Sequence, residues 1–167
     1  SESNAATIIK TTDFVNDSAS FLATAISAAI TANGRCAIGL SGGGTPKPIY
    51  TQLAKTTKDS INWTKVTVFL VDDRHISADH KDSNTNLVTT YLLNYLNKDN
   101  QPTCIFADTS IGIRKCVAKY NTQIAALYSK GVDVLVLGMG PDGHIASLFP
   151  PLTDICYDTK ETIIHTQ

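Results

Sequence analysis

CAIGLSGGGTPKPIY, residues 36–50, is the stretch that decides the fold. It begins with a short apolar run, Cys36–Leu40, which predicts a buried strand. A serine and three glycines then predict a turn. Thr45 followed by Pro46 is typical of an N-cap and a first helical position, and we expect this helix to extend to about Lys55. Strand, glycine turn and helix in this order form one step of an α/β fold.

Helical and strand patterns also alternate on both sides of this stretch. Asp13 and Gly34 are typical cap and stop signals for a helix over Phe14–Asn33. The expected apolar stripe of that helix comprises Phe21, Leu22, Ala25, Ile26, Ala29 and Ile30. Further strands are expected at Val66–Val71, Cys104–Phe106, Val132–Leu137 and Thr162–Thr166, and further helices at Thr85–Leu96 and Ile113–Lys130.

This alternation predicts an open, mostly parallel, doubly wound sheet with helices on both faces, a Rossmann-like α/β fold. We expect a single domain over residues 1–167, because the sequence contains no repeat, low-complexity tract or linker. Ligands of such sheets bind beyond the carboxyl ends of the strands, near the point where the strand order reverses.

Composition and charge exclude several classes of partner. The chain has 167 residues, with 14 basic and 15 acidic residues spread along it, so no basic block is available for nucleic acid or for an anionic membrane. No apolar run is long enough to span a membrane, and the first residues lack a signal-peptide pattern. Cys36 and Cys104 lie in apolar runs and no CxxC pair is present, so we expect a reduced, cytoplasmic protein.

Three predicted strands end in unusual residues, and a parallel sheet brings such ends to one edge. The glycines of the first end, Gly42, Gly43 and Gly44, predict a phosphate cradle, because glycine lets the backbone approach a ligand and the following helix start carries partial positive charge. No Gly-Lys-Ser/Thr follows, so this is not a Walker loop. A plain turn is the alternative, but three glycines exceed what a turn needs.

The second end carries Asp72, Asp73, Arg74 and His75. Arg74 can offset the repulsion between the two carboxylates or bind a phosphate. For Asp73 we favour a surface charge cluster, whereas for Asp72 and Arg74 a surface role and a site role both stay open. His75 and His80 are interpreted as loop histidines, because no cysteine or carboxylate stands at metal-ligand spacing.

The third end reads GMGPDGH, residues 138–144. Gly138–Gly143 matches the G-x-G-x-x-G dinucleotide pattern, but it lies late in the chain and no strand ends in an acidic residue about twenty positions later. The pattern also leaves His144 unexplained. Histidine changes its charge near neutral pH, so we favour a general base over a loop cap, with Asp142 close enough to orient its ring.

Three ordered motifs resemble those of the 6-phosphogluconolactonase family: LSGGGTPKPIY (40–50), VFLVDDRHISADHKDSN (68–84) and VLVLGMGPDGHIASLFP (134–150). The resemblance extends from about Phe14 to the end of the chain. That family shares the NagB-type fold of glucosamine-6-phosphate isomerase/deaminase. It hydrolyses 6-phosphogluconolactone to 6-phosphogluconate in the oxidative pentose phosphate pathway, with no metal or organic cofactor.

The resemblance implies that His144 is the general base that activates water and that Asp142 supports it. It implies a sugar-phosphate pocket lined by Gly42, Gly43, Gly44, Thr45, Asp72, Arg74 and Gly143. It also raises glucose-6-phosphate dehydrogenase as a fused or associated partner. Family members continue past Gln167, so we expect a C-terminally incomplete domain.

Several residues separate the lactonase from the deaminase pattern. Arg74, the Ser83-Asn84 pair and Ala146–Pro150 agree with lactonases, whereas Gly44 and Ile145 lean toward deaminases. Three alternatives therefore stay open: an amino-sugar phosphate isomerase/deaminase, a non-catalytic sugar-phosphate sensor of the same fold, and a nucleotide-binding domain.

Overall fold

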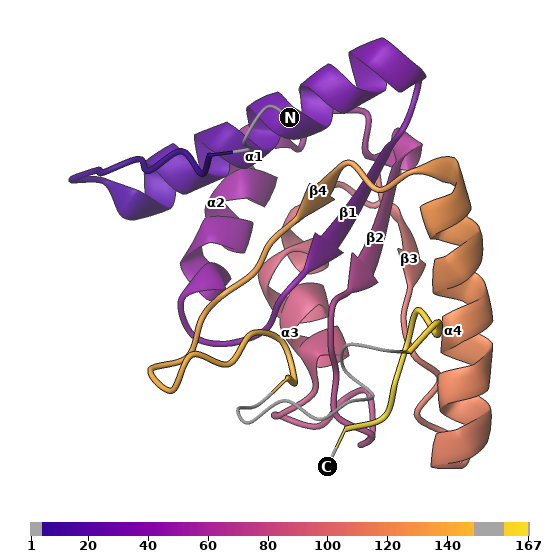
Figure 1. The fold of residues 1–167 in the computed structure, drawn as a ribbon. Helices are drawn as coiled ribbons and strands as arrows, with labels where there is room; N and C mark the ends of the chain where they lie inside the picture. Colours follow the sequence, from indigo (N-terminus) through magenta and orange to yellow (C-terminus); the bar gives the residue numbers. More distant parts are fainter. Residues whose placement is uncertain (1–4, 149–158, 167) are drawn as a thin grey trace.

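The computed structural model describes residues 5–148 and 159–166, in which helices and strands alternate (Figure 1). Its elements are α1 (Phe14–Asn33), β1 (Cys36–Leu40), α2 (Pro46–Thr57), η1 (Trp63–Lys65), β2 (Val66–Leu70), α3 (Asn84–Tyr91), η2 (Leu93–Tyr95), β3 (Thr103–Ile105), α4 (Ile113–Lys130) and β4 (Val134–Leu135), where η denotes a 3₁₀ helix. No helix in the described ranges combines the length and hydropathy needed to cross a bilayer.

The strands form one parallel sheet in the order β3-β2-β1-β4. The chain moves outward from β1 to β3 and then crosses back to place β4 on the other side of β1. The strand order therefore reverses between β1 and β4, which is where ligands of such sheets bind.

Helices cover both faces of this sheet. Figure 1 shows α4 on one side and α1 and α2 on the other. Alternate strand residues separate the two layers: Ile38 and Val68 join the core beneath α1 and α2, whereas Ala37 and Phe69 pack against α4. The predicted α/β class with a parallel, doubly covered sheet is confirmed.

Local start and stop signals placed most elements correctly. The Asp13 side chain accepts a hydrogen bond from Asn16 N, and Gly34 has a left-handed φ of 74°. The predicted bounds of α1, β1 and α4 agree with the structure. The expected stripe on α1 was wrong for Phe21, which is 62% exposed, because the buried face is formed by Ala19, Leu22, Ile26 and Ala29.

Other elements differ in extent. Thr45 adopts helical geometry and makes no side-chain cap, and α2 continues to Thr57. The helix expected over 85–96 ends at Tyr91 and gives way to η2. The Gln101 side chain donates to three carbonyls there, those of Leu93, Leu96 and Asn97, and so stabilises the early end.

The last two expected strands required the largest corrections. Strand β4 comprises only Val134–Leu135, and Leu135 is 44% exposed, because within the described residues β4 lies at the sheet edge and pairs with β1 alone. Residues 162–166 form no strand. Asn121 Oδ1 instead accepts hydrogen bonds from the amides of Thr162 and Ile163, which holds this segment against α4.

Candidate active site

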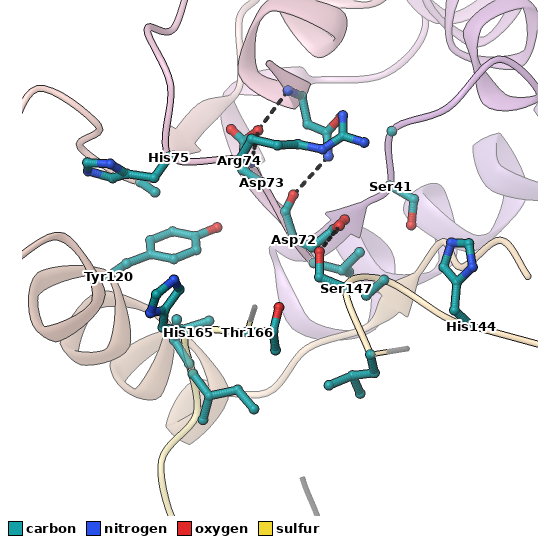
Figure 2. A pocket seen from close by; sticks show the side chains of 18 of the residues that line it. Ser41, Asp72, Asp73, Arg74, His75, Tyr120, His144, Ser147, His165 and Thr166 are labelled. Carbon is teal, nitrogen blue, oxygen red and sulfur yellow. Dashed lines mark hydrogen bonds between the residues drawn. The ribbon is translucent and has the colours of Figure 1, made fainter. Parts of the chain in front are cut away.

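The three predicted strand ends meet around one cavity of about 870 Å³ at the carboxyl edge of the sheet. Ser41–Pro46 contribute from the end of β1, Val71–His75 from the end of β2, and Gly138–Gly140, His144 and 146–148 from the end of β4. Figure 2 shows Ser41 and His144 toward one end of this pocket and His75, Tyr120 and His165 toward the other.

Most residues predicted for the site line this cavity. They are Gly42, Gly43, Gly44, Thr45, Asp72, Arg74 and His144. Asp142 and Gly143 are not among the lining residues. Asp142 lies beside the His144 ring, and Gly143 forms a turn with a φ of 85°. Neither residue therefore lines the pocket directly: Asp142 contacts the His144 side chain, and Gly143 shapes the loop.

Each of the three positions in the glycine loop accommodates glycine for a different physical reason. A Cβ at Gly42 would lie 2.0 Å from Asn84 Oδ1, so the Asn84 side chain occupies the space that any other residue would need. Gly43 has a φ of 97°, which favours glycine. A Cβ at Gly44 would meet nothing within 4 Å, so this glycine adds only open space beside the start of α2. Anions bind well at such a helix start.

The neighbouring carboxylates Asp72 and Asp73 have different partners. Asp72 Oδ2 accepts a hydrogen bond of 2.6 Å from Ser147 Oγ, which connects the end of β2 to the His144 loop. Asp73 instead accepts from the amides of Asn84 (2.8 Å) and Thr85 (3.3 Å) at the start of α3. The expectation of a surface charge cluster was wrong for Asp73: it is a half-buried acceptor at a helix N-terminus.

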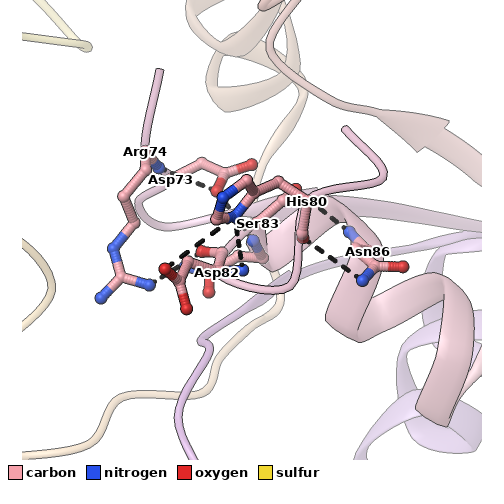
Figure 3. A network of polar contacts seen from close by, with 7 residues as sticks. Asp73, Arg74, His80, Asp82, Ser83 and Asn86 are labelled. Atoms are coloured by element: carbon pink, nitrogen blue, oxygen red, sulfur yellow. Dashed lines mark hydrogen bonds and ion pairs between the residues drawn. The ribbon is translucent and has the colours of Figure 1, made fainter. Parts of the chain in front are cut away.

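The Arg74 side chain extends from the same segment and forms no ion pair with either carboxylate. Its Nη1 donates to the carbonyl oxygen of Asp82 at 2.9 Å, and its amide donates to Asp73 Oδ1 (Figure 3). No ion pair links Arg74 to Asp72 or Asp73. A carbonyl group thus holds the guanidinium at the pocket wall, and no acid among the described residues forms an ion pair with it.

His144 is fixed by a tight turn. Gly140 N donates to His144 O at 2.8 Å, and Gly143 N donates to Gly140 O at 2.9 Å. The imidazole lies directly over Gly140, where a Cβ would come within 2.2 Å of its ring atoms. Gly140 is therefore required by the neighbouring imidazole.

Asp142 determines which nitrogen of His144 carries the proton. Asp142 Oδ1 lies 2.5 Å from His144 Nδ1 and accepts from His144 N at 3.1 Å. These hydrogen bonds lower the pKa of the Asp142 carboxyl below its ordinary value, and the bond from the imidazole has the largest effect. An ionised carboxylate can only accept, so Nδ1 bears the hydrogen and Nε2 is the basic nitrogen of the neutral ring.

The dinucleotide interpretation of Gly138–Gly143 does not fit this geometry. The fingerprint requires a helix that begins at the last glycine. Here the residues after Gly143 form isolated bridges, in which Ile145 pairs with Met139 and with Leu148. The loop is shaped around the His144 ring and leaves no helix start for a pyrophosphate among residues 144–148.

The histidines near the second strand end each have a backbone partner. His75 Nε2 lies 2.7 Å from Ile111 O, and His80 Nδ1 accepts from Asp82 N at 3.0 Å. In the described part of the chain, no group of three or more histidine, cysteine, aspartate or glutamate side chains is arranged to hold a metal ion.

Sequence reasoning missed three polar side chains of this region. Ser147 and Asn84 were noted only as parts of family motifs, yet Ser147 binds Asp72 and Asn84 Nδ2 donates to Asp72 O at 3.0 Å. Ser41, which lines the pocket and is 8% exposed, also carries no sequence signal of a site role. No local pattern signals these contacts, because each partner is at least twelve residues away in the sequence.

Comparisons with known proteins identify the family of this chain. The profile of the family described as glucosamine-6-phosphate isomerases/6-phosphogluconolactonase matches residues 10–167. A probable 6-phosphogluconolactonase of Dictyostelium discoideum is 36% identical over 158 residues, which cover 92% of this chain and 65% of that protein. A bifunctional glucose-6-phosphate 1-dehydrogenase/6-phosphogluconolactonase of Plasmodium falciparum is 39% identical over 123 residues, 72% of this chain and 13% of that protein.

A solved structure shares the fold as well. The crystal structure of 6-phosphogluconolactonase from Thermotoga maritima superposes with a TM-score of 0.73 at 28% identity, covering 84% of this chain and 62% of that one. The chain thus spans less than two thirds of the length of each of these proteins.

Proposed function

The chain belongs to the family of glucosamine-6-phosphate isomerases and 6-phosphogluconolactonases, and we propose that it acts as a lactonase that hydrolyses 6-phosphogluconolactone to 6-phosphogluconate. One observation carries the proposal: His144, with its Nδ1 bound to Asp142, shares a single cavity with the triple-glycine loop. A base and an anion cradle in one pocket suit a phosphorylated substrate that reacts with water.

The reaction follows from these positions. His144 Nε2 removes a proton from water while the water oxygen bonds to the lactone carbonyl carbon, whose π electron pair moves onto its oxygen. When that pair returns, the bond from the carbonyl carbon to the ring oxygen breaks. The imidazolium gives its proton to the departing oxygen, which becomes a hydroxyl group, and the carboxylic acid product ionises in solvent.

The remaining lining residues have supporting roles in this proposal. Backbone amides of the glycine loops are the candidate donors to the oxyanion. The start of α2 and Gly42–Gly44 receive the phosphate, and Arg74 adds positive charge at the wall formed by the end of β2. Asp142 holds the imidazole in the tautomer whose Nε2 is basic.

The names of the relatives favour a lactonase over the sister activity. Arg74 and the Ser83-Asn84 pair support the same choice. We extend the proposal to a partner: a glucose-6-phosphate dehydrogenase that supplies the lactone, since the Plasmodium falciparum relative combines both names in one protein. A cytoplasmic location stays a prediction from cysteine usage.

The test is the rate of acid release from freshly prepared 6-phosphogluconolactone, measured above spontaneous hydrolysis. We expect His144→Ala to lower kcat by at least about 10²-fold, the usual contribution of a general base. His80→Ala, a histidine outside the pocket lining, should retain activity. Ammonia release from glucosamine 6-phosphate would indicate the deaminase instead, and saturable binding of 6-phosphogluconate without turnover would indicate a sensor.

A further inference from the structure

The hydrogen-bond ladder between β1 and β4 ends in an unusual way at Ser41. The last backbone bond of the ladder runs from Val136 N to Gly39 O at 2.9 Å. In a regular parallel ladder the next bond would run from Ser41 N to Val136 O. Instead, Ser41 N donates to the hydroxyl of Tyr50 at 3.1 Å, and Val136 O accepts from Ser41 Oγ at 2.5 Å.

Tyr50 provides the hydroxyl that accepts the hydrogen bond from the Ser41 amide. Its side chain projects from α2, is fully buried, and its hydroxyl also donates to Ser41 O at 2.6 Å. The hydroxyl therefore satisfies both backbone groups of Ser41, one as acceptor and one as donor. Burial raises the pKa of Tyr50 above its ordinary value, so the proton needed for donation stays in place.

Beyond this point the two strands continue into two different loops, and both loops line the pocket. β1 leads directly into Gly42–Gly44, and β4 leads through Gly138 to His144. The side-chain hydroxyl of Ser41 thus replaces the backbone bond that would otherwise join Ser41 to Val136. Figure 2 shows Ser41 toward the same end of the pocket as His144.

Tyr120 provides a similar contact at the end of β2. Its buried hydroxyl accepts from Leu70 N at 3.0 Å and donates to Leu70 O at 2.9 Å. Tyr120 projects from α4, on the opposite face of the sheet, and its hydroxyl lies 3.4 Å from Ile105 O of β3. It therefore bridges β2 and β3, whereas the Tyr50–Ser41 pair connects the glycine loop to the strand that carries the His144 loop.

We propose that Tyr50 and Ser41 are positioning residues that set the distance between the glycine loop and His144. The inference rests on the proposed function, because the two loops must contact one substrate. Neither residue needs to touch the reacting atoms. A displacement of about 1 Å between catalytic group and substrate lowers rates by about 10²-fold, so a small relaxation of this tether suffices to impair the reaction.

The test uses Ser41→Ala and Tyr50→Phe, with Ser41→Thr as the variant that keeps the hydroxyl. We expect Ser41→Ala to lower kcat per folded molecule by about 10–10²-fold, with a smaller change in KM, and Ser41→Thr to recover most of the loss. The matched control is Thr57→Val, which removes a buried hydroxyl from the other end of the same helix, where it accepts from Trp63 Nε1.

A second readout separates this inference from the proposed function. The Hε1 resonance of His144, assigned by comparison with His144→Ala, reports the position of the ring in the absence of substrate. We expect it to shift or broaden in Ser41→Ala and to stay unchanged in Thr57→Val. An unmoved resonance together with wild-type kcat per folded molecule overturns the positioning role. Absence of wild-type turnover overturns the lactonase proposal alone, and the resonance then decides the positioning role.

Discussion

His144, Asp142 and Gly140 act together, although of the three only His144 presents a side chain to the pocket. The carboxylate of Asp142 selects the tautomer, and the missing side chain of Gly140 provides the space that the imidazole occupies. The two requirements are independent: one is electrostatic and the other steric. Both are satisfied within a five-residue turn, so the ring position does not depend on distant packing alone.

Gly140→Ala should therefore displace the imidazole. The new Cβ would lie 2.2 Å from two ring atoms, a distance that real Cβ atoms do not tolerate. We expect kcat for lactone hydrolysis to fall by at least about tenfold, because the base leaves its productive position. Steady-state kinetics on the purified variant measure the effect.

Gly138→Ala is the matched control for that substitution. A Cβ at Gly138 would meet nothing within 4 Å and its φ is not positive, so alanine should be accommodated with nearly wild-type kcat. Equal losses in the two variants would show that the loop needs glycine for flexibility and would contradict the steric explanation.

The start of α3 connects two of the three strand ends. Asp73, just after β2, accepts hydrogen bonds from the Asn84 and Thr85 amides, and Ser83 Oγ accepts from Asn86 N. The α3 N-terminus is thereby held against the end of β2. The Asn84 side chain, fixed in this way, fills the space beside Gly42. A helix start thus determines the shape of the glycine loop on the neighbouring strand.

Asp73→Ala tests this arrangement. Loss of the acceptor leaves two amides at the half-buried helix start unpaired, so we expect the free energy of unfolding to fall by about 1–2 kcal/mol. Urea denaturation followed by circular dichroism measures the change. Asp99→Ala, at an exposed acidic residue, is the control and should leave stability within about 0.5 kcal/mol of wild type. Equal stability of the two variants would mean that Asp73 is only a surface charge.

The molecule as a whole buries neutral thiol and phenol groups on both faces of the sheet. Burial raises the pKa of the Cys36 thiol to about 12 and that of the Cys104 thiol to about 11. It also raises the pKa values of Tyr50 and Tyr120 above their ordinary value. Each of these groups is kept neutral by the fold and would ionise more readily in the unfolded chain.

Stability should consequently fall in alkali. A raised folded-state pKa contributes stability that is fully present below the unfolded pKa, 9.0 for a thiol, and is lost as pH rises toward the folded value of about 12. We expect the free energy of unfolding to decrease progressively above about pH 9. Urea titrations between neutral pH and pH 11 measure it, and Cys36→Ala should show a shallower decrease. A constant free energy across that range would refute the prediction.

Signals carried by neighbouring residues were sufficient for most of the fold. The Asp13 cap, the Gly34 stop and the apolar runs of β1 and β2 act within a few residues, so the alternation of helices and strands follows from the sequence. A parallel sheet brings its strand ends to one edge. The shared pocket of Gly42–Gly44 and His144 was therefore predictable from the sequence.

Contacts between distant residues were decided only when the chain packed. Asp73 accepts hydrogen bonds from a helix start, β4 is an edge strand among the described residues, and the Ser41 amide donates to Tyr50 instead of to the neighbouring strand. Each outcome depends on which of several available groups forms the hydrogen bond or the packing contact in the folded chain. The local sequence determines which donors and acceptors are available. The tertiary structure determines which of them pair, because residues distant in the sequence come together only in the folded chain.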